Sequence, residues 1–180
     1  LYGLDKPKNI HQLGNKLTDE LKKQSSQRLL IVGEAIRNGE SIDTIQKLTK
    51  YDKWFIRQIS DLVDLEKEIK KNKLEKNLIL IAKKNGFSDK KISSILNISE
   101  IDVRKFRNHN KINPVYRLVD TCAGEFDSKT PYLYSTYDWK LENNKFCESN
   151  PSNRKKVIIL GGGPNRIGQG VEFDYCCVHA

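Results

Sequence analysis

Apolar residues recur at helical spacing through most of the first 112 residues. Asp52 stands where a helix N-cap is needed, and the pattern after it predicts a helix over residues 51–71. The apolar stripe of this helix requires partner helices to cover it. Its inward positions are Phe55, Ile59, Leu62, Val63, Glu66 and Ile69.

Three further segments provide candidate partner helices. Ser41 opens one of them, and Gly39 and Gly86 close the other two, as helix capping requires. The connections are a few residues long, which predicts a compact α-helical domain over residues 7–112. The partner helices are predicted in residues 19–39, 41–50 and 74–86.

Residues 88–110, SDKKISSILNISEIDVRKFRNHN, have the pattern of a helix-turn-helix. In a DNA-binding pair, the first turn of the second helix contacts base edges. That turn carries Ser99, Glu100 and Asp102 here, and its two carboxylates would face the negative duplex. The basic residues fall in later turns, where they complement the helix dipole; they are Arg104, Lys105 and Arg107.

The net charge keeps a nucleic-acid-binding module as an alternative. Residues 1–112 hold 24 Lys plus Arg against 15 Asp plus Glu, and this excess accounts for the formal net charge of +9. Such asymmetry is typical of nucleic-acid binders. However, 24 of the 32 basic residues are Lys, and the chain is also rich in Asn and Ile, so a bias toward AT-rich codons is an alternative source of the excess. The two helices also have enough apolar residues to pack without DNA, namely Ile92, Ile95, Leu96, Ile98, Ile101, Val103 and Phe106.

Length and composition limit the remaining classes. The 180 residues, 37% of them hydrophobic, suffice for one domain and part of a second. The sequence has neither a run of about eighteen apolar residues nor a signal peptide, so we expect no membrane span and a cytoplasmic protein. Because the chain begins at Leu1, contains no Met and stops at Ala180 inside an apparent helix start, we expect a piece of a longer polypeptide. The four cysteines lack metal-binding spacing and are expected to be reduced thiols: Cys122, Cys147, Cys176 and Cys177.

The residue composition and the hydrophobic periodicity change after Ile112. Residues 113–153 are rich in Tyr and Pro and lack helical periodicity, which predicts an extended linker whose aromatic side chains act as packing anchors. Residues 154–180 then predict the first strand, loop and helix of an α/β domain. Val157–Leu160 is a continuous apolar run of the kind found in buried parallel strands, and glycines follow it directly.

A strand followed by a glycine turn and a helix start is typical of anion-binding loops. The loop glycines are Gly161, Gly162, Gly163, Gly168 and Gly170. A P-loop would need Gly-Lys-Ser/Thr, and the dinucleotide fingerprint has a different glycine spacing. From spacing alone, a tight packing turn, an anion site and a truncated dinucleotide-binding domain all remain possible.

Two long stretches resemble the large subunit of carbamoyl-phosphate synthase. They are VDTCAGEFDSKTPYLYSTY and KKVIILGGGPNRIGQGVEFDYCCVHA, and the upstream YDKWFIRQISDLVDLE and NPVYRLVD are also similar to that family. The resemblance implies a helical oligomerisation domain followed by the start of the second synthetase half, a pre-ATP-grasp domain. The N-terminal helices match more loosely than the glycine loop.

The resemblance implies a parent enzyme that makes carbamoyl phosphate from bicarbonate, two ATP and ammonia. A glutamine amidotransferase would supply the ammonia, Mg or Mn would accompany ATP, and the parent would be a homo-oligomer serving arginine or pyrimidine synthesis. The fragment itself would hold no ATP-grasp fold, no catalytic residue, no cofactor and no specific nucleic acid.

Residue roles near the glycine loop follow from the same resemblance. Residues 161–170 would lie near the internal route taken by carbamate, with Gly170 leaving space that a side chain would fill. Arg166 and Glu172 would line the path or hold the loop, and a simple ion pair between them is the alternative. For residues 7–112 we expect no catalytic pocket, because the sequence shows no cluster of titratable groups.

Overall fold

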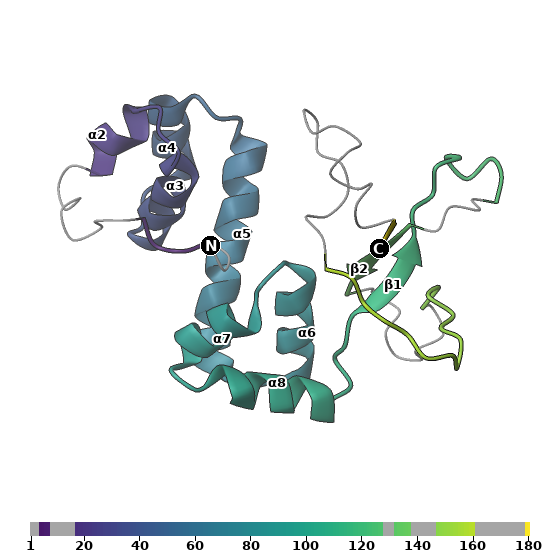
Figure 1. The fold of residues 1–180 in the computed structure, drawn as a ribbon. Coiled ribbons are helices and arrows are strands. Elements are labelled where there is room, and N and C mark those ends of the chain that lie inside the picture. The colour runs from purple at the N-terminus through teal and green to yellow at the C-terminus, as the bar shows by residue number, and fades with distance from the viewer. Residues whose placement is uncertain (1–3, 8–16, 128–131, 138–146, 161–178) are drawn as a thin grey trace. The chain divides into compact units, whose positions relative to one another are not determined.

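The computed structural model describes residues 4–7, 17–127, 132–137, 147–160 and 179–180. The chain divides into two units, Leu1–Ser149 and Asn150–Ala180. The described part of the first unit is mainly α, as expected, and carries one small sheet (Figure 1). Its elements are α2 Leu17–Lys22, α3 Arg28–Arg37, α4 Ile42–Thr49, α5 Lys53–Asn72, α6 Lys76–Lys84, α7 Asp89–Leu96, α8 Glu100–His109, β1 Val115–Leu118 and β2 Leu133–Thr136.

The long helix α5 organises the helical part. Helices α3 and α4 pack against it in one half, and α6 and α7 pack against it in the other (Figure 1). One core lies in each half: Ile45 and Ile56 are fully buried in the first, and Ile79 and Val103 in the second. Burial of each such side chain contributes about 1.5–3 kcal/mol, so α5 is held by apolar packing along most of its length.

The two halves repeat one structural plan. Helices α3 and α6 both end in Asn-Gly, with Gly39 and Gly86 at φ of 88° and 83°. In each case the two amides after the cap donate back to the last helical turn in a Schellman pattern. The next helix starts at a serine cap two residues later, Ser41 or Ser88, which accepts from the amide three residues on. The α3–α4 and α6–α7 connections therefore have the same turn, set by the same pattern of Asn, Gly and Ser.

The sequence predictions for the helices hold with two corrections. The helix expected over residues 19–39 is two helices, α2 and α3, because the side chains of Ser25 and Ser26 compete for backbone hydrogen bonds and favour a break over a continued turn. In α5 the inward position at the start is Ile56, fully buried, while Phe55 is 59% exposed. The remaining predicted helices, including the helix-turn-helix of α7 and α8, are present.

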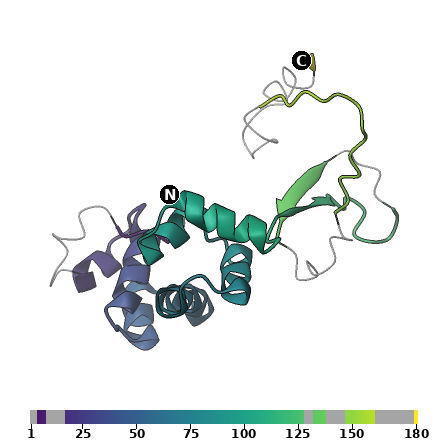
Figure 2. The ribbon, with the colours of Figure 1, turned by 90° about the horizontal axis from the view of Figure 1, so that it is seen from below.

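The segment after Ile112 is extended, and two parts of it pair with each other. Strands β1 and β2 are antiparallel, with Val115 opposite Thr136 and Leu118 opposite Leu133. Seen from below, this hairpin follows the end of α8 (Figure 2). Most of its aromatic side chains are exposed, but Tyr137 packs against the second core, where Lys83 lies 5.3 Å from its ring centre. Tyr137 is therefore the one described tyrosine of the segment that acts as the expected packing anchor.

The described part of the second unit contains no paired strand. Val157, Ile158 and Leu160 are each more than four-fifths exposed, and the predicted strand at Val157–Leu160 has no ladder partner among the described residues. No helix in the described part of the chain is both long and apolar enough to cross a membrane.

Candidate functional site

The residues predicted to line the carbamate path lie outside the described part of the chain. This applies to Arg166, Gly170 and Glu172, and to the glycine-loop residues Gly161, Gly162, Gly163 and Gly168. Their predicted roles stay predictions. The polar groups that the structure does bring together lie in the helical part.

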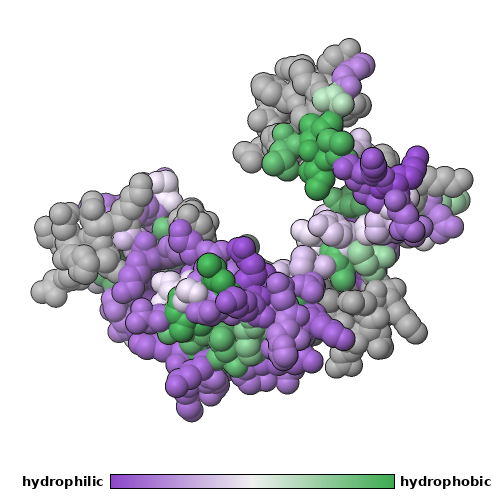
Figure 3. Space-filling model, turned by 60° about the horizontal axis from the view of Figure 1, so that its bottom comes forward, coloured by the Kyte–Doolittle hydropathy of each residue, from purple (hydrophilic) through white to green (hydrophobic). Residues whose placement is uncertain are grey.

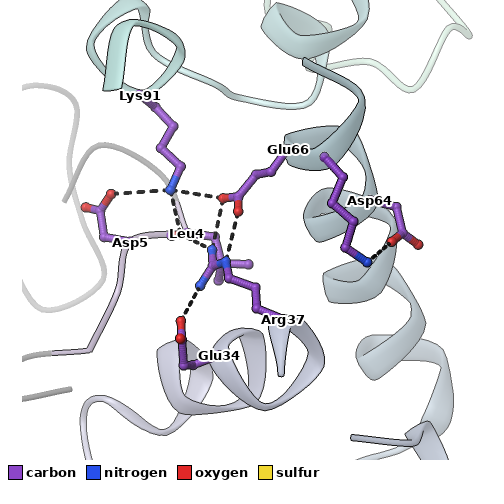
Figure 4. A network of polar contacts seen from close by, with 8 residues as sticks. Leu4, Asp5, Glu34, Arg37, Asp64, Glu66 and Lys91 are labelled. Carbon is purple, nitrogen blue, oxygen red and sulfur yellow. Dashed lines mark hydrogen bonds and ion pairs between the residues drawn. The ribbon is translucent and has the colours of Figure 1, made fainter. Parts of the chain in front are cut away.

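A largely buried network of charges joins α3, α5 and α7 around Glu66 (Figure 4). Arg37 donates from Nε and Nη2 to the two carboxylate oxygens of Glu66, at 2.9 Å each, and from Nη1 to Glu34 at 3.1 Å. Lys91 Nζ lies 2.9 Å from the Oε1 of Glu66. The side chains of Arg37, Glu66 and Lys91 are each no more than 15% exposed, so these pairs are shielded from solvent.

The same network fastens the segment at Leu4 and Asp5 to the helices. The carbonyl oxygen of Leu4 accepts from Arg37 Nη2 at 2.7 Å and from Lys91 Nζ at 2.9 Å. Asp5 lies 3.9 Å from Lys91. Three helices and the N-terminal segment thus meet at one set of charges, close to the boundary between the two apolar cores.

The electrostatics of this network keep its carboxylate ionised. Burial, the largest single influence, raises the pKa of Glu66, but the hydrogen bonds and charges of Arg37 and Lys91 outweigh it and lower that pKa below its ordinary 4.5. The pKa of Arg37 is raised, because contact with Glu66 and Glu34 outweighs the desolvation of the guanidinium. Neither group exchanges a proton near neutral pH.

A second ion cluster ties α8 to α6 and α7. Arg107 donates from Nε and Nη2 to the two oxygens of Asp89, at 2.8 and 2.6 Å, and Lys83 reaches Asp89 at 3.0 Å. Arg107 Nη1 also donates to the carbonyl oxygen of Ile112, which fixes the exit of α8. Burial raises the pKa of Asp89, but Arg107 and Lys83 outweigh it and lower that pKa below its ordinary 3.8.

The expectation that titratable groups are not clustered in this region is therefore wrong. The described residues of this region form two such clusters, which the sequence did not reveal because their members are far apart in the chain. One signal was available: Glu66 occupies an inward position in the apolar stripe of α5, and a charged residue at such a position requires a partner.

The chemistry open to these clusters is limited. All four carboxylates, Glu34, Glu66, Asp89 and Asp5, lie within ion-pair distance of a cation. Across the described residues, no group of three His, Cys, Asp or Glu side chains is placed to hold a metal ion. Such an arrangement holds helices together and does not supply a nucleophile with its base.

A cleft of about 630 Å³ opens beside the Glu66 network. Besides Glu66, Arg37 and Lys91, its walls include four further lysines from the N-terminal segment, α5 and α7. They are Lys6, Lys67, Lys70 and Lys90.

The helix-turn-helix uses its cations for internal contacts. Arg107 holds Asp89, and Arg104 lies 3.2 Å from Glu100 on the same helix. Val103 is fully buried between the helices, but Ile101, expected to pack there, is 62% exposed. The helical part otherwise shows a mainly hydrophilic surface around a smaller apolar patch (Figure 3).

Comparison with known proteins identifies the helical part. Residues 1–111 match the family model of the carbamoyl-phosphate synthetase large chain, oligomerisation domain. The chain belongs to the carbamoyl-phosphate synthetase large-chain family. Residues 153–180 match a second model, the carbamoyl phosphate synthase preATP-grasp domain, which agrees with the strand, loop and helix start expected there.

Curated relatives of this carbamoyl-phosphate synthetase segment are similar over nearly its whole length. A carbamoyl phosphate synthase large chain of Vibrio cholerae is 47% identical over 168 residues, which is 92% of this chain and 15% of that protein. The large chains of Neisseria meningitidis serogroup B and Thermotoga neapolitana are 49% and 45% identical, over 89% and 91% of this chain and 15% and 14% of their own. The chain thus spans about one seventh of the length of these relatives.

Proposed function

We propose that the chain is the central structural segment of a carbamoyl-phosphate synthase large chain, and that it joins domains and copies of the enzyme without catalysing a step itself. The match of residues 1–111 to the oligomerisation domain carries this proposal. The carboxylates of Glu66 and Asp89, each paired with two cations, support it, because neither is poised to exchange a proton near neutral pH.

The activity proposed for the longer polypeptide is the synthesis of carbamoyl phosphate. It would consume two ATP with Mg or Mn, bicarbonate, and ammonia from a glutamine amidotransferase subunit or domain, in the cytoplasm. The relatives named above are large chains of carbamoyl phosphate synthases, which supports this assignment. Residues 7–112 would be the oligomerisation domain, 113–153 the linker and 154–180 the start of the pre-ATP-grasp domain.

Self-association needs an exposed apolar surface, and the repeated plan of the helical part offers one in each half. Trp54, in the first turn of α5, and Ile101, in the first turn of α8, follow equivalent capped starts and are 59% and 62% exposed. Trp54 also packs edge-on against the exposed Phe55, at 5.0 Å between ring centres. Exposed aromatic and aliphatic side chains of this kind are enriched in subunit contacts.

Sedimentation velocity over a range of concentrations tests the oligomerising role. We expect the chain to self-associate, and Trp54→Ala combined with Ile101→Ala to shift it toward monomer. Leu29→Ala removes a comparably exposed apolar side chain elsewhere and should leave the association unchanged. A chain that stays monomeric up to high micromolar concentration contradicts this part of the proposal.

An activity assay tests the non-catalytic role separately. The chain alone should hydrolyse no ATP in response to bicarbonate, whereas a longer polypeptide that contains it should form carbamoyl phosphate from ammonia. Bicarbonate-dependent ATP hydrolysis by the chain alone would show that it carries a catalytic site.

For the loop residues we propose that Arg166 and Glu172 line the carbamate path and that Gly170 keeps it open. Carbamate is anionic and hydrolyses readily in water, so an enclosed path with a fixed cation suits it. Arg166→Gln in the longer polypeptide should lower the carbamoyl phosphate formed per ATP hydrolysed, because carbamate would escape. An unchanged ratio would favour a simple loop-fixing role for Arg166.

A further inference from the structure

One edge of the small sheet, along β1, is covered by Glu148. The amide of Glu148 donates to the carbonyl oxygen of Tyr116 at 2.8 Å, and its carboxylate accepts from the amide of Leu118 at 2.6 Å. The backbone groups of Tyr116 and Leu118 therefore point away from β2. In an antiparallel pair, residues whose backbone groups face the partner strand alternate with residues whose groups face outward.

The other edge of the sheet, along β2, is open. Leu133 and Ser135 lie opposite the two outward-facing residues of β1, so their backbone groups also point outward. The amide of Val119, by contrast, donates across the sheet to the carbonyl oxygen of Tyr132 at 2.9 Å, as the alternation requires. Among the described residues, β2 has β1 as its one strand partner. The outward N–H and C=O groups of Leu133 and Ser135 are thus available to a further strand.

The side chains of this sheet do not protect the open edge from pairing. Natural edge strands commonly carry a charge or a proline, and β2, with the sequence Leu-Tyr-Ser-Thr, has neither. Tyr116, Leu118 and Leu133 lie on one face of the sheet, and each is at least one-third exposed. A two-stranded sheet is marginally stable by itself in water, and a third strand would supply apolar neighbours for these side chains.

The hairpin is anchored where it leaves the helical part. Ile112 and Val115 are buried before and at the start of β1, and Tyr137, directly after β2, packs against the second core. Arg107 also holds the carbonyl oxygen of Ile112. Because the edge is presented by an anchored element, a strand that pairs with it pays less conformational entropy than it would on a free loop.

We propose that the β2 edge accepts an extended strand from the part of the longer polypeptide that lies outside this chain. The proposal rests on the proposed function in one respect, namely that the chain is a segment of a longer polypeptide; it covers 15% of the Vibrio cholerae relative. A strand of the same polypeptide has a high effective concentration at the edge, which favours it over a second copy. It would bond to the main chain of Leu133 and Ser135 and carry apolar side chains at alternate positions.

Residue-resolved hydrogen exchange of the longer polypeptide and of this chain alone, each at low concentration, tests the proposal. We expect the amides of Leu133 and Ser135 to exchange at least about tenfold more slowly in the longer polypeptide. The amides of Tyr134 and Thr136 face β1 and are the internal reference. Ser135→Pro removes an outward amide, so in the longer polypeptide Leu133 should return to rapid exchange while Tyr134 stays unchanged. Ser135→Ala keeps the amide and is the matched control.

Three outcomes overturn the proposal. Rapid exchange at Leu133 and Ser135 in both proteins would show that the edge stays open. Slow exchange in the dilute chain alone would show that the edge is covered within this chain. Slowing that appears in both proteins only as concentration rises would assign the edge to a second copy.

The carbamoyl phosphate assay described above separates this proposal from the proposed function. A longer polypeptide that forms carbamoyl phosphate while its β2 edge amides exchange rapidly would contradict the strand pairing alone. Slow edge amides in a longer polypeptide without that activity would contradict the proposed function and leave the strand pairing standing.

Discussion

At the scale of single residues, the position of Glu66 determines how the helical part is tied together. Its carboxylate receives two hydrogen bonds from Arg37 and one ion pair from Lys91, and the same cations hold the Leu4 carbonyl oxygen. A buried ion pair costs desolvation when it forms, so its net gain is small, but removing one partner leaves the others unpaired. Removing the Glu66 carboxylate should therefore destabilise the fold by more than the net free energy that its ion pairs contribute.

Glu66→Gln should lower the free energy of unfolding by about 3 kcal/mol, because Arg37 and Lys91 would stay buried without their anion. Asp64→Asn is the matched control, since Asp64 lies on the same helix and pairs with Lys67 at the exposed surface. That control should change stability by less than about 0.5 kcal/mol. Urea unfolding of the three proteins measures both values, and equal losses would show that the network is not a buried one.

The pH dependence of stability follows from Glu66 and Asp89 with a definite sign. Both carboxyls have a lowered pKa in the folded chain, from ordinary values of 4.5 and 3.8, so their stabilisation is fully present above these values. It is lost as the pH falls through the lower folded-state pKa. We expect stability to be level from pH 8 to about 6 and to fall below about pH 4.5. Urea unfolding across this range checks it, and Glu66→Gln with Asp89→Asn should flatten the acid limb.

At the scale of elements, the capping residues determine where each helix begins and ends. Ser41, Ser88 and Ser99 cap three helices, and left-handed residues end α4 and α7 at Lys50 and Asn97. Asn tolerates that conformation, but a lysine there is strained by its Cβ. Lys50, at φ 61°, is thus a position where the backbone requirement overrides the side-chain preference.

Lys50→Gly should raise the free energy of unfolding by about 0.5–1 kcal/mol, since glycine adopts the left-handed cap without strain. Lys47→Gly, in the interior of the same helix α4, should lower it by about 1 kcal/mol. Thermal unfolding of both variants measures the contrast. A loss at position 50 would show that the lysine side chain makes a contact that outweighs the strain.

The helix-turn-helix of α7 and α8 should bind duplex DNA weakly and without sequence preference. Its acidic first turn repels the backbone, and Arg104 and Arg107 are engaged with Glu100 and Asp89. Fluorescence anisotropy with labelled duplexes should detect binding at about 20 mM salt that disappears near 150 mM. Sequence-selective binding that survives physiological salt would restore the nucleic-acid alternative.

At the scale of the whole molecule, the two units differ in how their apolar residues are covered. In the first unit, two cores enclose the inward faces of the helices. In the second unit, Val157 and Leu160 are about 90% exposed. An exposed apolar strand edge is a site for pairing with another strand, so these residues need a sheet that the described part of the chain does not supply.

Hydrogen exchange tests this difference. Amides at residues 157–160 should exchange rapidly in a dilute monomer of this chain, while those of Ile59 and Ile79, in the centres of α5 and α6, should be protected. In a longer polypeptide that contains the rest of the pre-ATP-grasp domain, the same four amides should become slow. Protection at residues 157–160 in the isolated chain would show that the strand finds partners within it.

The amino-acid sequence alone determined most of the local structure and the family. Helix periodicity and the caps at Asp52, Ser41, Ser88, Gly39 and Gly86 are local properties, so the helices could be predicted close to their observed bounds. The family followed from a specific glycine-loop motif and the stretches around it, and the comparisons confirm it.

The tertiary structure decided what depends on distant residues. The choice of Ile56 over Phe55 for the core depends on where α3 and α4 pack, and periodicity places both near the same face. The pairing of β1 with β2 joins two strands that are not adjacent in the sequence, so local sequence patterns do not determine it. The Glu66 network brings α3, α5, α7 and the segment at Leu4 together. Such contacts depend on how distant segments pack. The sequence indicated them only through Glu66, a charged residue on the inward side of a helix.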